Sequence, residues 1–197
     1  RLRQYLIDEN QIKFLSKTND LSNINPGEFI EINGTLQKNP IVDFIDSLMK
    51  FMELAMTFEE KPKGKANQDN ENKKIMYQMK AMGDNLKSGN IIDLICSVES
   101  NFKIVLPSYL NYFFNSNMNE IIDGKYTILG KVSRVIIDED DEINLLRNTS
   151  FSLIQHSMLE ACFGEFSSLE QNGLHAPNIS TVVKGPTLMV IPISIFL

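Results

Sequence analysis

The longest run of alternating apolar and polar side chains lies between residues 124 and 137. Apolar side chains recur on one face of this run at even-numbered positions: Tyr126, Ile128, Val132 and Ile136. This period of two is typical of a β-strand. Gly130 interrupts the run where a bulge or a close backbone approach is expected, and the acidic turn of residues 138–142 ends it. The pattern predicts one long, bent antiparallel strand.

Three shorter segments also have the pattern of strands. Residues 28–36 alternate in polarity, and residues 102–106 form a short apolar run that Pro107 closes. Residues 185–195 are apolar on both faces, which is typical of a strand that is covered on both sides. Pro192 lacks an amide hydrogen, so we expect a bulge or an edge position there.

Helical spacing of apolar residues covers five further stretches: residues 40–58, 75–88, 91–98, 108–114 and 151–173. The first stretch begins at Asn39 and Pro40, which suit a cap and a first turn. Its apolar residues cover most of its circumference, so we expect this helix to be largely buried. Residues 1–16 fit either a helix or an extended lead-in, and the pattern leaves both open.

Residues 59–74 separate the first two predicted helices and contain one alanine and no larger apolar side chain. Such a segment cannot bury enough surface to offset the entropy of ordering it. We therefore expect a mobile loop, which limited trypsin digestion should cut first.

These elements together predict an α+β fold, with a mainly antiparallel sheet and helices packed against it. The helices that begin at Pro40 and Phe151 are expected to cover the sheet. A single domain spanning residues 1–197 is the simplest organisation at this length. The predicted strands of the sheet are residues 28–36, 102–106, 125–137 and 185–195.

The composition is 43% hydrophobic and 22% charged, with a formal net charge of -6, as in ordinary globular proteins. Proteins bind nucleic acid largely because their Lys and Arg side chains release counterions from the phosphate backbone. A chain with a negative net charge gains little free energy in this way, so nucleic acid is not an expected partner. No apolar run reaches the length of about 18 to 20 residues that a membrane-spanning helix requires, so a membrane is not an expected partner either.

The two cysteines, Cys96 and Cys162, lie within apolar helical patterns and are expected to be buried thiols. Such thiols favour a reducing, cytoplasmic location. No signal peptide is recognisable, and the sequence begins with Arg1 rather than methionine. We therefore expect a fragment of a longer cytoplasmic protein.

No motif of catalysis or of cofactor binding is convincing. Residues 124–131 invite comparison with a phosphate-binding loop, but five residues rather than four separate their glycines, and Val132 follows the lysine. Residues 138–142 could hold a hard cation through carboxylate oxygens, but the spacing of a calcium loop is missing, so a solvated hairpin turn is favoured. We predict no catalytic, cofactor-binding or metal-binding residue and no cofactor.

The sequence contains two histidines. His156 has Glu160 four residues on along a predicted helix, which favours a surface pair over a catalytic base with its orienting group. His175 lies in a predicted loop, and no nucleophile-elbow motif is present. An enzyme is therefore not favoured, although a hydrolase that uses His156 stays an alternative.

Aromatic side chains are concentrated between the strand-like segment of residues 102–106 and the long strand, more densely than one helical stripe requires. These residues are a possible interaction surface, with capping of the core as the alternative reading. Two hypotheses follow. An extensive apolar inventory without convergent catalytic groups favours a non-enzymatic binding or regulatory module for a protein partner or small ligand. The aromatic residues and the absent start methionine favour a structural domain of a larger protein that forms homo-oligomers. The candidate surface consists of Tyr109, Tyr112, Phe113 and Phe114.

Several short motifs occur along the chain in a fixed order: residues 27–34 (Gly-Glu-Phe-Ile-Glu-Ile-Asn-Gly), 128–132 (Ile-Leu-Gly-Lys-Val), 145–147 (Leu-Leu-Arg), 185–186 (Gly-Pro) and 190–193 (Val-Ile-Pro-Ile). Their order and spacing resemble the C-terminal part of a bacterial family catalogued as domain of unknown function 6414. The resemblance implies a cytoplasmic bacterial protein whose N-terminal portion is absent here. It implies no catalytic residues.

Overall fold

The structure is a computed structural model, and it describes residues 1–16, 18–58, 76–77, 80–81, 83–86, 90–98, 102–113, 119–149, 152 and 180–197. The chain divides into two compact units. The first unit comprises Arg1–Asn39, Asn90–Leu145 and Val182–Leu197. The second unit comprises Pro40–Gly89 and Leu146–Thr181.

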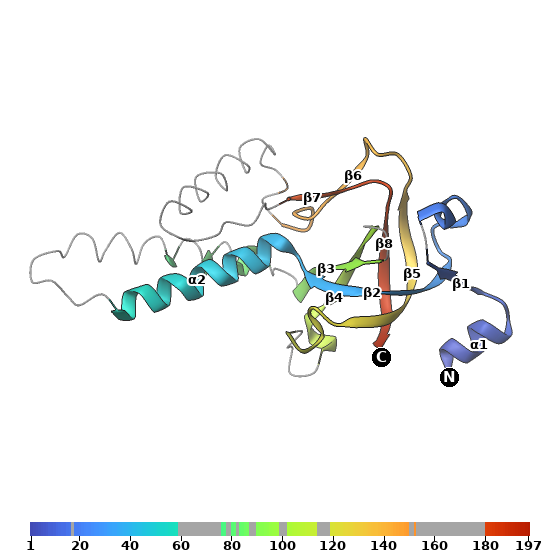
Figure 1. The fold of residues 1–197 in the computed structure, drawn as a ribbon, viewed down its shortest axis with the longest axis horizontal. Coiled ribbons are helices and arrows are strands. Elements are labelled where there is room, and N and C mark those ends of the chain that lie inside the picture. The colour runs from blue at the N-terminus through green and yellow to red at the C-terminus, as the bar shows by residue number, and fades with distance from the viewer. Residues whose placement is uncertain are drawn as a thin grey trace, which may run out of the picture. The chain divides into compact units, whose positions relative to one another are not determined.

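The first unit is built around a ring of five strands (Figure 1). These are β2 (Phe29–Lys38), β3 (Ile91–Ser97), β4 (Lys103–Tyr109), β8 (Thr187–Phe196) and β5 (Lys125–Ile136). Each strand pairs with the next, and β5 pairs back with β2, so the sheet closes into a barrel. A sixth strand, β1 (Ile12–Leu15), lies parallel to β2 outside the ring.

The prediction of a fold with both helices and strands is confirmed, and most of the described pairings are antiparallel. Two pairings, β1 with β2 and β4 with β8, are parallel, so the sheet is mixed. When the five ring strands are numbered by their order in the chain, their order around the ring is first, second, third, fifth and fourth. The third and the fifth of them, β4 and β8, are parallel. These are the strand order and directions of an OB-fold, a five-stranded Greek-key barrel.

Two long segments interrupt this barrel, one between β2 and β3 and one between β5 and β8. The second of them contains β6 (Glu142–Asn144) and β7 (Val182–Lys184), which form a small antiparallel pair. The acidic segment of residues 138–142 leads from β5 into β6, and its side chains are exposed, as expected of a solvated turn. It is not the hairpin that the sequence favoured, because β6 pairs with β7 rather than with β5.

The side chains that point into the barrel are apolar and fully buried. Directly opposed residues of neighbouring strands share a face, so the strand registers define one continuous interior row. Burying this row supplies the main hydrophobic stabilisation of the unit. Its members include Ile30, Ile32 and Leu36 of β2, Leu94 and Cys96 of β3, Ile104 and Leu106 of β4, Ile128 of β5, and Leu188 and Val190 of β8.

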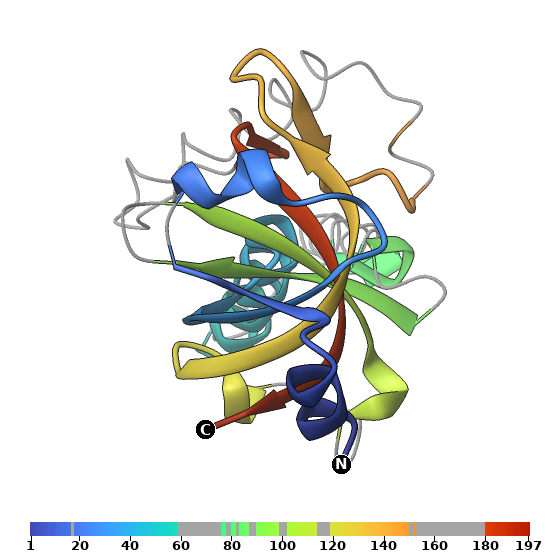
Figure 2. The same cartoon turned by 90° about the vertical axis from the view of Figure 1, so that its right-hand side faces the viewer.

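Glycines mark the places where the long strands bend. Gly34 lies just before Thr35, the residue of β2 that pairs with both β3 and β5. Gly130 lies at a register shift between β5 and β8, where Leu129 faces Ser194 and Gly130 faces Pro192. The extra residue of β8 beside Pro192 confirms the bulge predicted there, and Figure 2 shows the bend of β5.

Residues 91–98 were expected to be a helix, and this prediction is wrong because residues 91–97 form β3. Both faces of this strand are largely buried, since interior Leu94 alternates with outward-facing Asp93 and Ile95, which are also buried. A strand buried on both faces has no alternation of polarity, and its continuous apolar run also fits helical spacing.

Residues 108–114 were also expected to be a helix. Instead β4 continues through Pro107 to Tyr109, and the described part that follows is a single 3₁₀ turn, Leu110–Tyr112. The pairing of β4 with β8 involves Ile104 and Val105, so Pro107 lies beyond it, where a missing amide hydrogen is tolerated. A second 3₁₀ turn, Asn119–Ile121, precedes β5.

The N-terminal segment is a helix followed by a strand, so both readings of residues 1–16 hold in part. Helix α1 (Leu2–Asp8) leads into β1, and a 3₁₀ helix, Thr18–Asn23, follows. Leu6 and Ile12 pack on Leu129 of β5. The N-terminal segment therefore covers part of the outside of the barrel.

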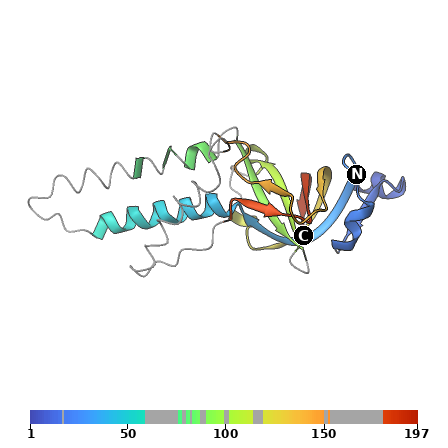
Figure 3. The same ribbon diagram turned by 90° about the horizontal axis from the view of Figure 1, so that it is seen from above.

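The second unit contains α2 (Pro40–Phe58), which confirms the predicted bounds of this helix (Figure 3). Its first turns are buried through Ile41, Ile45 and Leu48, whereas Phe51 and Leu54 are exposed. The expectation of a largely buried helix therefore holds for its first half. Residues 76–77, 80–81 and 83–86 are helical, in agreement with the second predicted helix. The predicted loop of residues 59–74 and nearly all of the helix of residues 151–173 lie outside the described residues.

Candidate functional site

The outer face of the β3–β4 pair carries a row of side chains whose exposure differs along its length. The row consists of four directly opposed pairs: Ser97 with Lys103, Ile95 with Val105, Asp93 with Pro107, and Ile91 with Tyr109. Ile95, Val105 and Asp93 are buried. Ile91 is half-buried, and Tyr109 is 46% exposed. The row therefore ends in an accessible aromatic side chain at the end of β4.

Tyr112 lies next to Tyr109 because the chain makes one 3₁₀ turn after β4. Such a turn has three residues per repeat, so positions three apart lie on the same side. The two ring centroids are 5.6 Å apart, and the ring planes make an angle of 56°. This tilted arrangement is favourable for aromatic pairs. Tyr112 is 86% exposed, so its ring is available to a partner.

The pair of Tyr109 and Tyr112 is the candidate site, and we call it the tyrosine pair. Two exposed rings offer a large apolar contact area at a low entropic cost, because each ring has two side-chain torsions. Their faces attract cationic groups, and their hydroxyls donate or accept hydrogen bonds. The arrangement therefore offers an accessible aromatic contact surface.

The predicted aromatic surface is brought together in part. Tyr109, Tyr112 and Phe113 follow one another at the end of β4, and Phe113 is half-buried. Phe114 lies outside the described residues, as do His156, Glu160, His175 and Cys162. The hydrolase alternative that uses His156 therefore stays untested.

Two ion pairs tie the N-terminal segment to β2 and to the turn before it, and the sequence pattern did not predict them. Arg3 donates two hydrogen bonds to the carboxylate of Glu31, one of them 2.9 Å long from Nη2, and its guanidinium carbon lies 5.8 Å from the centroid of the Phe196 ring. The hydrogen bond to Glu31 raises the pKa of Arg3. Partners 28 residues apart leave no periodic signal in the sequence.

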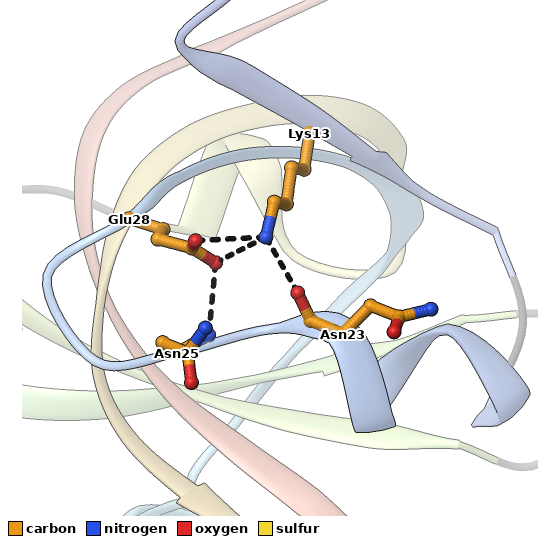
Figure 4. A network of polar contacts seen from close by, with 4 residues as sticks. All are labelled: Lys13, Asn23, Asn25 and Glu28. Carbon is orange, nitrogen blue, oxygen red and sulfur yellow. Dashed lines mark hydrogen bonds and ion pairs between the residues drawn. The ribbon is translucent and has the colours of Figure 1, made fainter.

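The second ion pair belongs to a small network around the turn before β2 (Figure 4). Lys13 Nζ lies 2.7 Å from both carboxylate oxygens of Glu28 and also donates to the carbonyl oxygen of Asn23. The amide of Asn25 donates to the same carboxylate over 2.8 Å. These hydrogen bonds, that from Lys13 foremost, lower the pKa of Glu28. The network braces the turn and β1, so we assign it a structural role.

Cys96 is buried, as the sequence predicted, but it lies on β3 rather than on a helix. Its thiol is free, and burial raises its pKa to about 12. A thiolate is the reactive form, so this cysteine is a core residue rather than a nucleophile.

The remaining sequence candidates behave as structural elements. Lys131, in the segment compared with a phosphate-binding loop, lies on β5, and its Nζ is 5.8 Å from the centroid of the Phe29 ring. Within the described residues, no three His, Cys, Asp or Glu side chains converge as a metal site would require. Among the helices that the structure describes, none has the length and apolar character to cross a membrane.

Comparison with known protein families identifies the family of this chain. The family model described as Domain of unknown function (DUF6414) matches residues 1–196, so the chain belongs to this family. The resemblance found in the sequence is thereby confirmed, whereas its assignment to the C-terminal part of a longer protein stays a prediction. No curated protein and no solved structure matches the chain.

Proposed function

We propose that this member of the DUF6414 family is a non-enzymatic binding or regulatory module whose tyrosine pair contacts a segment of a partner protein. The observation that carries the proposal is the exposure of Tyr112, at 86%, in a fixed pair with Tyr109. Aromatic side chains at such positions are the residue types that dominate binding energies at protein interfaces.

The position of Tyr109 in the barrel supports the proposal. In barrels with this strand order, the face of the second and third ring strands binds ligands. Those strands are β3 and β4 here, and Tyr109 ends their outer row. This support is an analogy of fold, so the tyrosine pair itself has to be tested.

The charge of the chain favours a protein segment over nucleic acid. OB-fold barrels often bind oligonucleotides, but a chain with a net charge of -6 provides little attraction for a phosphate backbone. Tyrosine rings attract the guanidinium and ammonium groups of proteins, and a negatively charged chain does not repel them. A small ligand that stacks on the rings stays an alternative within the same proposal. A bacterial, reducing cytoplasm is part of the proposal, supported by the free thiol of Cys96 in the barrel core.

Site-specific photo-crosslinking in the native cells tests the proposal. p-Benzoylphenylalanine replaces Tyr112 in the full chain, and the matched control carries it at Phe14, an exposed aromatic position on β1. We expect an adduct with one protein from position 112 and none from position 14. Adding Tyr109→Ala should weaken that adduct at least several-fold. Equal adducts from both positions, or none from position 112, would contradict the proposal.

A second candidate is self-assembly, in which the tyrosine pair contacts another copy of the chain. The same high exposure of Tyr112 favours it, because large exposed aromatic side chains are common at subunit interfaces. The crosslinking experiment separates the two candidates by mass, since self-assembly gives an adduct of twice the chain mass.

A further inference from the structure

A bulge in β5 gathers polar side chains on the outer face of the barrel. The register between β5 and β8 shifts at Ser133, so that Lys131 faces Ile191 and Arg134 faces Met189. A bulge places two successive residues on one face. Lys131, Ser133 and Arg134 are accordingly all exposed, while Val132 between them is buried in the barrel.

Neither cation of this group has an acidic partner among the described residues. Lys131 lies above the ring of Phe29, and no carboxylate of the described chain is within ion-pair distance of either Lys131 or Arg134. The ion pairs described above use Arg3 and Lys13 instead. Ile191 is directly opposite Lys131 and 47% exposed, so apolar surface accompanies the charges.

The same strand continues into residues of the opposite character. Ile137 follows the end of β5 and is 63% exposed. The acidic turn, Asp-Glu-Asp-Asp-Glu at residues 138–142, comes next, and all five side chains are exposed. Among the described residues, the carboxylates of this turn accept one hydrogen bond, from the amide of Asp140 to Asp138, and Lys184 of β7 is directly opposite Glu142 in the strand register. The strand therefore carries two cations, then an exposed isoleucine, then five carboxylates.

We propose that this stripe, residues 131–142, binds the same stripe of a second copy of the chain. A two-fold axis near Ile137 places the cations of each copy against the acidic turn of the other, so each contact is made twice. Ile137 meets its own symmetry copy at the centre, where an apolar contact needs no charge. Figure 1 shows β5 leading directly into the turn.

The occupant follows from complementarity of charge rather than from the exposed surface alone. An unrelated acidic partner would satisfy Lys131 and Arg134 but leave the acidic turn of this chain unmatched. A second copy satisfies both halves at once. Exposed ion pairs are individually weak and are screened by salt, so the association is expected to be reversible and strongest at low ionic strength. This inference does not depend on the tyrosine pair.

Sedimentation equilibrium of the full chain at low and high salt tests the proposal. We expect a monomer–dimer equilibrium whose dissociation constant rises at least about tenfold between low salt and about 0.5 M salt, because the Debye length shortens. Lys131→Glu should weaken the dimer to a similar degree at low salt. Lys103→Glu is the matched control, since it makes the same charge change at an exposed lysine of β4 and should leave the dimer unchanged.

A charge-swap pair makes the test specific. Lys131→Glu/Arg134→Glu and Asp140→Lys/Asp141→Lys should each dimerise poorly alone, and an equimolar mixture should restore a heterodimer. Circular dichroism checks that both variants are folded. A strictly monomeric native chain at low salt, or a mixture that stays monomeric, would overturn the proposal. Loss of the dimer in Tyr112→Ala but not in Lys131→Glu would instead assign self-association to the tyrosine pair.

Discussion

Replacing Gly130 by alanine is expected to destabilise the barrel. Where backbone and space permit, such a replacement usually stabilises a protein by about 0.4–1 kcal/mol, because it restricts the unfolded chain. At Gly130 the space is absent. An added Cβ would lie 2.5 Å from Val190 Cγ1 and 2.8 Å from the carbonyl oxygen of Ile191.

The backbone contact decides the sign of the effect. The Val190 methyl group could shift by a rotation, but the Ile191 carbonyl belongs to β8, which pairs with β5 on both sides of this bulge. Relieving the overlap requires the two strands to move apart. Overpacking of this kind costs about 1–3 kcal/mol, which exceeds the entropic gain. We therefore expect a net loss of roughly 1–2 kcal/mol in the free energy of unfolding.

Urea denaturation followed by circular dichroism measures this change, with an unchanged denaturant slope as a check that the unfolded state is comparable. Gly83→Ala is the control, because its added Cβ would be 3.5 Å from Ile45 Cγ2, an ordinary contact in a helical segment. That variant should be more stable than the native chain by up to about 1 kcal/mol. A Gly130→Ala protein at least as stable as the native chain would refute the packing described for β5 and β8.

Three further predictions concern the core, the turn before β2 and the two units. In a Cys162→Ser background, Cys96 should not react with Ellman's reagent near pH 8 until the protein is unfolded, because its pKa is raised to about 12; rapid reaction in the native state would contradict its burial. The lowered pKa of Glu28 adds stability that is fully present above the pKa of an unfolded glutamate, about 4.3, and is lost as the pH falls through the folded value. Thermal unfolding between about pH 6 and pH 3 should show a smaller loss for Lys13→Met than for the native chain, and equal losses would speak against the network. If residues 1–197 behave as one domain, calorimetry should give a single transition with equal calorimetric and van't Hoff enthalpies, whereas two separate transitions would assign independent stability to the two units.

Alternation of polarity predicts a barrel strand directly, whereas an apolar run without alternation is ambiguous: residues 185–195 were correctly expected to be a strand, and residues 91–98 were not. The alternation in β5 and the disruptive Pro192 in β8 gave the correct strands and the correct bulge. β3 lacks alternation because interior Leu94 and outer Ile95 are both buried, so its apolar run also fits the spacing of a helix. Closure of the ring could not be predicted at all, because the parallel pairing of Ile104 with Leu188 joins residues more than 80 positions apart.

The candidate site was predictable in composition but not in geometry. The density of aromatic residues pointed to Tyr109 and Tyr112, and both are exposed. Their pairing arises from a strand end and one 3₁₀ turn rather than from the expected helix, because β4 continues through Pro107. The ion pair of Arg3 with Glu31 had no signal, since it depends on where β1 lies beside β2.

Both proposed surfaces are built on strands of the closed barrel, and the parallel pairing of β4 with β8 is one of the pairings that complete the ring. Interstrand nuclear Overhauser effects in the isotope-labelled full chain test this contact directly. We expect effects between the backbone protons of Ile104 and Leu188 and of Val105 and Met189, in the pattern of parallel strands. Effects of antiparallel type are expected between Ile136 and Thr187. Pairing of β4 with a different strand, or the absence of any contact between β4 and β8, would contradict the barrel and both surfaces built on it.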